Sequence, residues 1–383
     1  MLWLTIGAGI AARLIVAAVT GTGTEDLHSI DIVRTALREH PLHLYVDVPN
    51  LRWPYPPGYL PAIGGLAGVS SVTGIDFLHL MRLAPIAADA GIALLVQHLL
   101  GTRGASERVR LAGAALVAFG PVFLGVSAYQ GQLDSVAILP ALAAFAVWQR
   151  GGPSRALSAG LLIGLGGSVK TVPLLMVLAL APSVRSRREL VTLALAAVAV
   201  PLAMLVPFLA VDPGAVHDHL TYRGFPGLGG LSLLAAPDYP LFWQAGHALP
   251  SNAVTDFLMD SGGLVAGAGL IAAAAIIARF RPDPLDAALI VWFAVWLLGV
   301  NFFIQYLVWG LPFLIARGHL RSALAIQLLA GPALLVLYLE RSEEWLIWSA
   351  YTAPMIALWA LVALLLARKV RGYSAAMPRP GAA

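Results

Sequence analysis

The chain has 383 residues, of which 59% are hydrophobic and 11% charged, and its mean hydropathy is +0.81. Soluble domains carry about a quarter charged residues, so this composition excludes an ordinary soluble protein and predicts an integral membrane protein. The absence of cysteine excludes disulfides, thiolate metal sites and cysteine nucleophiles, and we interpret the net charge of +4 as a membrane-topology signal rather than a nucleic-acid surface.

Apolar runs of about 20 residues are long enough to cross the bilayer as helices. We expect such helices near residues 2–20, 76–100, 109–128, 133–149, 189–210, 263–280, 284–301, 303–317, 320–339 and 345–367. Residues 156–182 differ, because arginine-bearing loops flank this run and Lys170 lies at its centre. Two half-helices meeting at Lys170 explain both features. The predicted fold class is all-α, a polytopic transmembrane bundle of about twelve membrane-entering helices in one domain, residues 1–383.

Lysine and arginine are concentrated on one side of these helices. One set of loops and the C-terminal end carry sixteen of the 24 basic residues, whereas the other side carries most of the acids. Since basic loops remain cytoplasmic, both termini are predicted to be cytoplasmic. We therefore expect a multi-pass protein of the inner or plasma membrane, with its active site on the non-cytoplasmic face.

Two long loops are predicted on the non-cytoplasmic side, at residues 21–75 and 211–262, and both exceed the usual length of a connector. In the first, IDIVRTALREH predicts a short surface helix, and residues 59–73 are too short to span, so they are predicted to lie in the interface or to re-enter the membrane. Between them, DVPNLRWPYPPGYL contains four prolines that restrict the backbone. Its aromatic residues Trp53, Tyr55 and Tyr59 are expected at the headgroup level.

Ionisable residues at membrane depth are costly and are therefore functional candidates. Arg82 and Asp89 are seven positions apart on one predicted helix face. Asp89 either is functional or neutralises Arg82 or a neighbouring helix, whereas the place of Arg82 near the outer end favours anion binding. Lys170 follows a Gly-Gly-Ser turn, which suits phosphate binding, and the alternative is a lysine that extends to the interface.

The stretch AYQGQLDSVAIL, residues 128–139, joins two predicted helices on the outer side. Gln130, Gln132 and Asp134 offer two amides and a carboxylate from one tight turn, which is typical of a site that binds hydroxyl groups. A second interpretation, equally open from the sequence, is that Asp134 caps the helix that begins beside it.

The first outer loop contains two candidate general bases. Asp26 follows the first helix closely, and a carboxylate at such a boundary can have a pKa raised toward working pH. Asp31 competes for this role, and for Asp26 the alternative is a helix cap or a solvated acid. His217 and His219 are spaced wrongly for two metal ligands on one helix, so we interpret them as surface residues and expect neither metal nor cofactor.

In chain order these features are a first-loop acid, a Tyr-Pro-Pro elbow, Arg and Asp in one helix, Gly-Gln-x-Asp, a lysine after a glycine-rich half-helix, YRG with SLL, and NFFIQYLVWGLP. This order resembles the GT-C superfamily of integral-membrane glycosyltransferases. Within it, the chain looks most like polyprenyl-phosphate-mannose-dependent mannosyltransferases of bacteria and the first mannosyltransferase of GPI-anchor synthesis. The resemblance covers the whole chain.

The resemblance implies that Asp26 is the catalytic base and that Lys170 contacts the donor phosphate. The other site residues that it implies are Tyr55, Pro56 and Pro57 of the elbow, Gln132 and Asp134 of the turn, Tyr222, Arg223 and Ser232 of the second outer loop, and Gln305 and Tyr306 at an outer helix end. Many relatives carry Asp-x-Asp or Glu-x-Asp, whereas Glu25 and Asp26 are adjacent here, so Asp31 remains a rival base.

The predicted function is inverting transfer of a hexose, mannose by the resemblance, from a polyprenyl-phosphate sugar to a hydroxyl of a glycolipid or glycan. The predicted partners are that donor, that acceptor and the lipid bilayer, without nucleic acid. The alternative is a polytopic transporter or lipid flippase, because intramembrane charges and broken helices suit one. Against it, the sequence contains no internal repeat, and alternating access does not need long outer loops.

Overall fold

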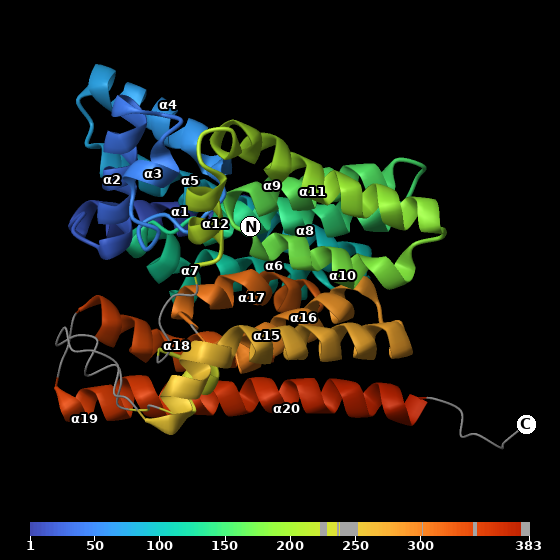
Figure 1. Cartoon of the computed structure of the whole chain (residues 1–383). Helices are drawn as coiled ribbons and strands as arrows, with labels where there is room; N and C mark the ends of the chain where they lie inside the picture. The colour runs from blue at the N-terminus through green and yellow to red at the C-terminus, as the bar shows by residue number, and fades with distance from the viewer. Residues whose placement is uncertain (223–227, 236, 238–251, 301, 340–342, 377–383) are drawn as a thin grey trace, which may run out of the picture. The chain divides into compact units, whose positions relative to one another are not determined.

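The computed structural model describes residues 1–222, 228–235, 237, 252–300, 302–339 and 343–376. These residues form helices and no β-strand, which confirms the predicted all-α class (Figure 1). Seven helical segments in the described part of the chain are long and apolar enough to cross a membrane: Leu2–Val19, Phe77–Thr102, Glu107–Gln130, Arg187–Leu209, Ala253–Phe280, Leu320–Tyr338 and Glu344–Ala375. The chain is therefore a polytopic membrane protein, and the total of about twelve membrane-entering helices stays a prediction.

Packing divides the chain into two compact units. The first comprises Met1–Val177, Val184–Gly224 and Leu311–Ala323, and the second comprises Leu178–Ser183, Phe225–Gly310 and Leu324–Ala383. A single transmembrane domain over residues 1–383, a catalytic first outer loop at 21–75 and a second outer loop at 211–262 stay predictions.

The first unit begins with the predicted first helix and the loop that follows it. Its elements are α1 (Leu2–Val19), α2 (Glu25–Glu39), α3 (Leu44–Asp47), η1 (Pro57–Tyr59), α4 (Leu60–Thr73), α5 (Phe77–Thr102), α6 (Glu107–Ala118), α7 (Pro121–Phe123), the π-helical turn η2 (Leu124–Gln130), α8 (Asp134–Arg150), α9 (Arg155–Val169), η3 (Val172–Leu175), α11 (Arg187–Leu209) and α12 (Pro213–Leu220). Helix α2 contains most of the predicted surface helix, and α4 covers most of residues 59–73, whose place in the interface or as a re-entrant helix stays a prediction.

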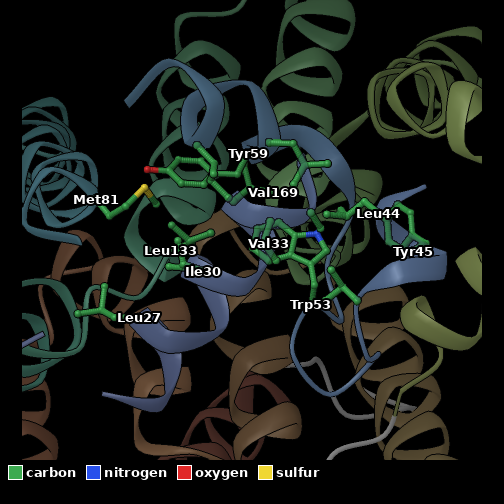
Figure 2. Packing of buried hydrophobic residues seen from close by; sticks show 14 of the residues in the cluster. Leu27, Ile30, Val33, Leu44, Tyr45, Trp53, Tyr59, Met81, Leu133 and Val169 are labelled. Carbon is green, nitrogen blue, oxygen red and sulfur yellow. The ribbon is translucent and has the colours of Figure 1, made fainter. Parts of the chain in front are cut away.

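The segment between α1 and α5 is packed into a hydrophobic core. Leu27, Ile30 and Val33 recur at helical spacing on α2, so one face of this helix is buried. They pack with Trp53 and Tyr59 of the elbow and with residues of α4, α5 and α8. Figure 2 labels Trp53, Tyr59 and Met81 of α5 in this core. This shared core fixes α2 and the elbow relative to the neighbouring helices.

Glycines on α9 allow a close approach to its neighbours. A Cβ atom at Gly160 would lie 2.6 Å from the Cβ atom of Ala196 on α11, and one at Gly166 would lie 2.3 Å from the carbonyl oxygen of Ala137 on α8. Small residues let membrane helices pack backbone to backbone. The end of α9, where Lys170 lies, is thereby held beside the start of α8.

The predicted break at Lys170 is present. Helix α9 ends at Lys170, whose φ of −142° and ψ of 142° are extended. The second part is a series of short pieces, η3, α10 (Met176–Leu180) and η4 (Ala181–Ser183), rather than one half-helix. Pro173 and Pro182 lie within these pieces, and proline cannot donate the backbone hydrogen bond that a continuous helix needs.

The second unit contains α13 (Gly230–Ala235), α15 (Ala253–Phe280), α16 (Pro284–Leu298), η5 (Ile304–Tyr306), α17 (Leu307–Ala316, which ends in the first unit), α18 (Leu320–Tyr338), α19 (Glu344–Leu346), η6 (Ile347–Thr352) and α20 (Ala353–Ala376). Helix α15 begins ten residues before the predicted start at 263, because Asn252 and Thr255 form a capping box. Lys369 of α20 bonds Asp286 of α16 at 2.6 Å.

Two predictions about side-chain surroundings are wrong. Trp53 and Tyr59 were expected to face lipid at the headgroup level, but they are 1% and 4% exposed within the protein core. His219 was interpreted as a surface residue, but it is buried, and its Nδ1 lies 2.9 Å from the carbonyl oxygen of Trp53. The contact of His219 with the backbone of Trp53 joins α12 to the elbow, and the rings of Trp53 and Tyr59 pack in the hydrophobic core.

Candidate active site

Asp26 lies at the start of α2, and its side chain does not cap the helix. The cap is Thr24, whose hydroxyl accepts a hydrogen bond from the backbone N–H of Leu27 at 3.4 Å and donates to the carbonyl oxygen of Gln130 at 3.5 Å. Glu25, the adjacent acid, is exposed and bonds Arg52 at 2.6 Å. Of these two neighbouring acids, only Asp26 has a carboxylate directed into the protein.

Two glutamine amides hold the carboxylate of Asp26. Gln130 donates to its Oδ2 atom through Nε2, and Gln132 donates to its Oδ1 atom through Nε2. The intervening Gly131 has a φ of 72°, a left-handed conformation that strongly favours glycine. A Cβ atom there would also lie 2.8 Å from Leu27. Glycine is therefore required for the turn that presents both amides to Asp26.

Gln132 also connects Asp26 to a buried ion pair. Lys170 donates through Nζ to Oε1 of Gln132 at 3.1 Å and to Oδ1 and Oδ2 of Asp134 at 3.0 and 2.9 Å. Because a lysine ammonium only donates, it fixes the amide oxygen toward Lys170 and the amide nitrogen toward Asp26. The cap interpretation of Asp134 is not observed: α8 has no side-chain cap, and Asp134 pairs with Lys170.

The aromatic elbow covers this ion pair. Nζ of Lys170 lies 4.7 Å from the centre of the Tyr55 ring, a cation–π contact. The elbow is positioned from two sides: the hydroxyl of Tyr45 donates to the carbonyl oxygen of Tyr55 at 2.8 Å, and Gly58 lies directly on Ser168 of α9, where a Cβ atom would come within 2.2 Å of Oγ. The rigid backbone thus keeps the Tyr55 ring over Lys170.

The surroundings of Asp26 make its carboxylate a stronger base than an ordinary aspartate. Removal from water raises the pKa of Asp26 from 3.8 to about 6. The amides of Gln130 and Gln132 and the charge of Lys170 oppose this rise, while the charge of Asp134 adds to it. Asp26 is therefore mainly ionised at neutral pH and can accept a proton, which is the property that a general base requires.

Three predicted site residues of the first unit lie outside this cluster. Asp31 is half-buried on α2 and pairs with Arg34 at 2.7 Å. Arg82 is completely buried and donates to backbone carbonyls, including those of Ala17 and Tyr129. Tyr222 is half-buried after α12. The catalytic prediction for Asp31 and the binding predictions for Arg82 and Tyr222 are not tested by these contacts and stay predictions.

The remaining predicted residues are in the second unit or outside the described residues. Gln305 and Tyr306 form part of η5, where the carbonyl oxygen of Tyr306 accepts from Trp296 at 3.0 Å, and Ser232 is buried on α13. Arg223 lies outside the described residues. Within the described part of the chain, no three His, Cys, Asp or Glu residues are grouped in a way that could hold a metal ion.

The sequence singles out Gln130 in the turn, but no local signal connects it with Asp26, which is 104 positions away. The sequence also leaves the partner of Asp89 open. In the structure that partner is Arg13 of α1, at 2.9 Å, so the neighbouring-helix interpretation holds for this contact. The signal in the sequence for this pair is Arg13 itself, because an arginine in the middle of an apolar run requires a buried acid as its partner.

A family model described as Glycosyltransferase family 87 matches residues 53–300, which is more than half of the chain. The matched range contains Tyr55, Gln132, Asp134 and Lys170, begins after Asp26 and ends before Gln305. No curated protein matches the chain.

Proposed function

The chain belongs to glycosyltransferase family 87 and is a membrane glycosyltransferase, and from this premise we propose that Asp26 is its general base. The observation that carries the proposal is the carboxylate of Asp26, held by two neutral amides, with a pKa raised to about 6 and with the nearest cation already bonded to Asp134. Such a carboxylate keeps its basicity because, in the part of the chain that the structure describes, the neighbouring cation Lys170 bonds Asp134 and not Asp26.

The proposed reaction is a single displacement. Asp26 takes the proton from an acceptor hydroxyl, the hydroxyl oxygen forms a bond to the anomeric carbon of the sugar, and the bond from this carbon to the phosphate oxygen breaks. The lipid phosphate leaves with the electron pair, and the positive charge of Lys170 stabilises it. One displacement inverts the anomeric carbon, so a β-linked donor gives an α-linked product.

We propose a polyprenyl-phosphate sugar as the donor, with mannose as the sugar, and a glycolipid or glycan as the acceptor. The support for a lipid-linked donor is the membrane character of the chain together with the ammonium of Lys170, which bonds the same glutamine that holds Asp26. A positive charge beside the proposed base suits a phosphate leaving group.

The test uses the purified chain in liposomes with polyprenyl-phosphate-mannose or polyprenyl-phosphate-glucose and a panel of acceptor lipids. Wild type should transfer one of the sugars, and Asp26→Asn should lower the rate by about a hundredfold to ten-thousandfold, the usual contribution of a general base. Asp31→Asn tests the rival base, because the carboxylate of Asp31 is paired with Arg34 and not with the glutamines that hold Asp26. Full activity in Asp26→Asn with loss in Asp31→Asn would reverse the assignment.

The same preparation separates the enzyme from the transporter. Movement of an unmodified substrate across sealed liposomes without any consumption of donor would favour a transporter or flippase. Topology is tested in the cell: we propose an inner- or plasma-membrane protein with both termini cytoplasmic and the active site on the non-cytoplasmic face. A tag at residue 240 should then be accessible from outside, and one at residue 186 should not.

A further inference from the structure

Helix α5 carries two buried ionisable residues, Arg82 and Asp89, and each of them bonds groups from other elements. Arg82 donates to the carbonyl oxygens of Ala17 at 2.7 Å and Gly21 at 2.6 Å, both from the end of α1 and the chain after it, and to that of Tyr129 at 2.9 Å. It therefore joins the segment that leads into Asp26 to the turn that carries the glutamines.

Asp89, two helical turns further along α5, holds the turn at both ends. It accepts hydrogen bonds from the hydroxyls of Ser127 at 2.6 Å and Ser135 at 2.5 Å. Ser127 belongs to η2 and precedes Gln130 by three residues, and Ser135 directly follows Asp134. The two serines thus bracket the part of the chain that binds Asp26 and Lys170.

The charge of Asp89 is balanced within the same network. Nε of Arg13 on α1 lies 2.9 Å from Oδ2 of Asp89, and the other donors of Arg13 bond the carbonyl oxygens of Gly9, Val117 and Ala118. Both side chains are almost completely buried, at 2% and 1% exposed. A buried acid that also has a cation can bond two serine hydroxyls without carrying an unbalanced charge.

The turn that these residues hold is not a conformation that helices adopt readily. Residues Leu124–Gln130 form a π-helical turn, which is rare and requires support from its surroundings, and the N–H of Gln132 returns to the carbonyl oxygen of Val126 at 3.0 Å. Apolar packing alone is non-directional, whereas the hydrogen bonds to Asp89 have fixed directions. They therefore set the angle at which both amides meet the carboxylate.

We propose that Asp89 is a positioning residue for the transfer reaction: through Ser127 and Ser135 it fixes the turn that presents Gln130 and Gln132 to Asp26. This inference rests on the proposed function. Asp89 touches no reacting group, and it acts only through the two serines and the glutamines between them.

The test removes the two hydroxyls and leaves the ion pair intact. Replacing Arg13 or Asp89 would leave a buried charge without its partner and would destabilise the fold, so the better probe is the double variant Ser127→Ala/Ser135→Ala. Ser158→Ala, a half-buried serine on α9, is the control for the loss of a serine hydroxyl. Thermal unfolding of all three proteins verifies that they are folded.

Two readouts separate positioning from a merely structural role. The double variant should lower kcat by about tenfold to a hundredfold with little change in KM, because a small misplacement of a catalytic group costs this much. The acidic limb of its pH–rate profile should move to higher pH, since Asp26 loses amide bonds that favour its ionised form, while Lys170, Asp134 and the Tyr55 hydroxyl, the other titratable groups that face it, are unaltered. A folded double variant with unchanged kcat, or with an unshifted limb, would overturn the proposal.

A titration that does not depend on sugar transfer distinguishes this proposal from the proposed function. Infrared difference spectra across the pH range contain a carboxyl band that should vanish in Asp26→Asn and is thereby assigned to Asp26. Its midpoint should be higher in Ser127→Ala/Ser135→Ala than in wild type and unchanged in Ser158→Ala. An unshifted midpoint overturns the positioning role whether or not wild type transfers sugar, whereas a shifted midpoint in a protein that consumes no donor overturns the proposed function alone.

Discussion

Two carboxylates of the first unit, Asp26 and Asp89, are each held by several hydrogen-bond donors, yet their surroundings differ in one respect. Asp89 has a cation of its own, because Arg13 lies 2.9 Å away, and two hydroxyls complete its contacts. Among the described residues, Asp26 is bonded by two neutral amides, and the lysine beside it is bonded to Asp134. The placement of the cation therefore separates a carboxylate that organises the fold from one that is available to take a proton.

The largest effect on stability is expected from replacing Lys170, the cation that is bonded to Asp134. In Lys170→Met, Asp134 remains as a buried unpaired charge, and breaking such a pair costs about 3–5 kcal/mol of unfolding free energy. The double variant Lys170→Met/Asp134→Asn should regain most of this stability, because both charges are gone. Its sugar transfer should remain about a hundredfold or more below wild type, since the charge that stabilises the leaving phosphate is missing.

Thermal unfolding and transfer rates, measured on the same three proteins, check this prediction. If the double variant recovered both stability and transfer, Lys170 would have only a structural role, as Arg13 has beside Asp89. The contrast between the surroundings of Asp26 and Asp89 would then not explain catalysis.

A smaller effect is expected from removing one amide from Asp26. Gln130→Met keeps the length of the side chain but removes the donor to Oδ2 of Asp26, a bond to a charged group worth about 1.5–3 kcal/mol. The pKa of Asp26 should rise further above 6, because the lost bond favours the ionised form. At pH 7 less of the base is then ionised, and transfer should fall by about tenfold.

The matched control for this variant is Gln149→Met, because Gln149 is exposed and bonds only Thr102 among the contacts described here. The pH dependence of kcat/KM is the measurement. An acidic limb that moves to lower pH in Gln130→Met would contradict the account, since it would mean that the amide favours the protonated carboxyl.

The smallest effect is expected at the elbow, and it concerns stability. In Gly58→Ala the new methyl group would meet Oγ of Ser168 at 2.2 Å and its carbonyl oxygen at 2.5 Å, so the elbow must move away from α9. Overpacking of this kind costs about 1–3 kcal/mol. Gly64→Ala is the matched control on α4, where no atom lies within 4 Å, and alanine there should stabilise the helix by about 0.5–1 kcal/mol. Thermal unfolding of both variants decides whether the elbow depends on contact with Ser168.

Local signals in the sequence predicted most of the helices and much of the candidate site. The apolar runs, the proline-rich elbow, the break at Lys170 and the Gly-Gln-x-Asp turn are all encoded by neighbouring residues, and each appears near its expected place. The Asp134–Lys170 pair unites two residues that sequence reasoning had selected separately.

Partners that are distant in sequence could not be predicted in the same way. Spacing on one helix left open whether Asp89 neutralises Arg82 or a neighbouring helix; Arg13 of α1 is the partner of Asp89, and Arg82 binds backbone carbonyls. Trp53 and His219 have amphipathic side chains that suit an interface as well as a core, so only the packing of α2, the elbow and α12 determines that both are buried. Such choices depend on tertiary contacts, which one sequence does not reveal.

The central claim is that Asp26 is the base of a glycosyl transfer reaction, and the most direct test is the pH dependence of single-turnover transfer in wild type and Asp26→Asn. In wild type the rate should rise with pH through a midpoint near 6, because the folded carboxyl is protonated below this value and ionised above it. In Asp26→Asn the residual rate should be low and should lack this limb. The same limb in Asp26→Asn, at a comparable rate, would contradict the account and assign the base to another residue.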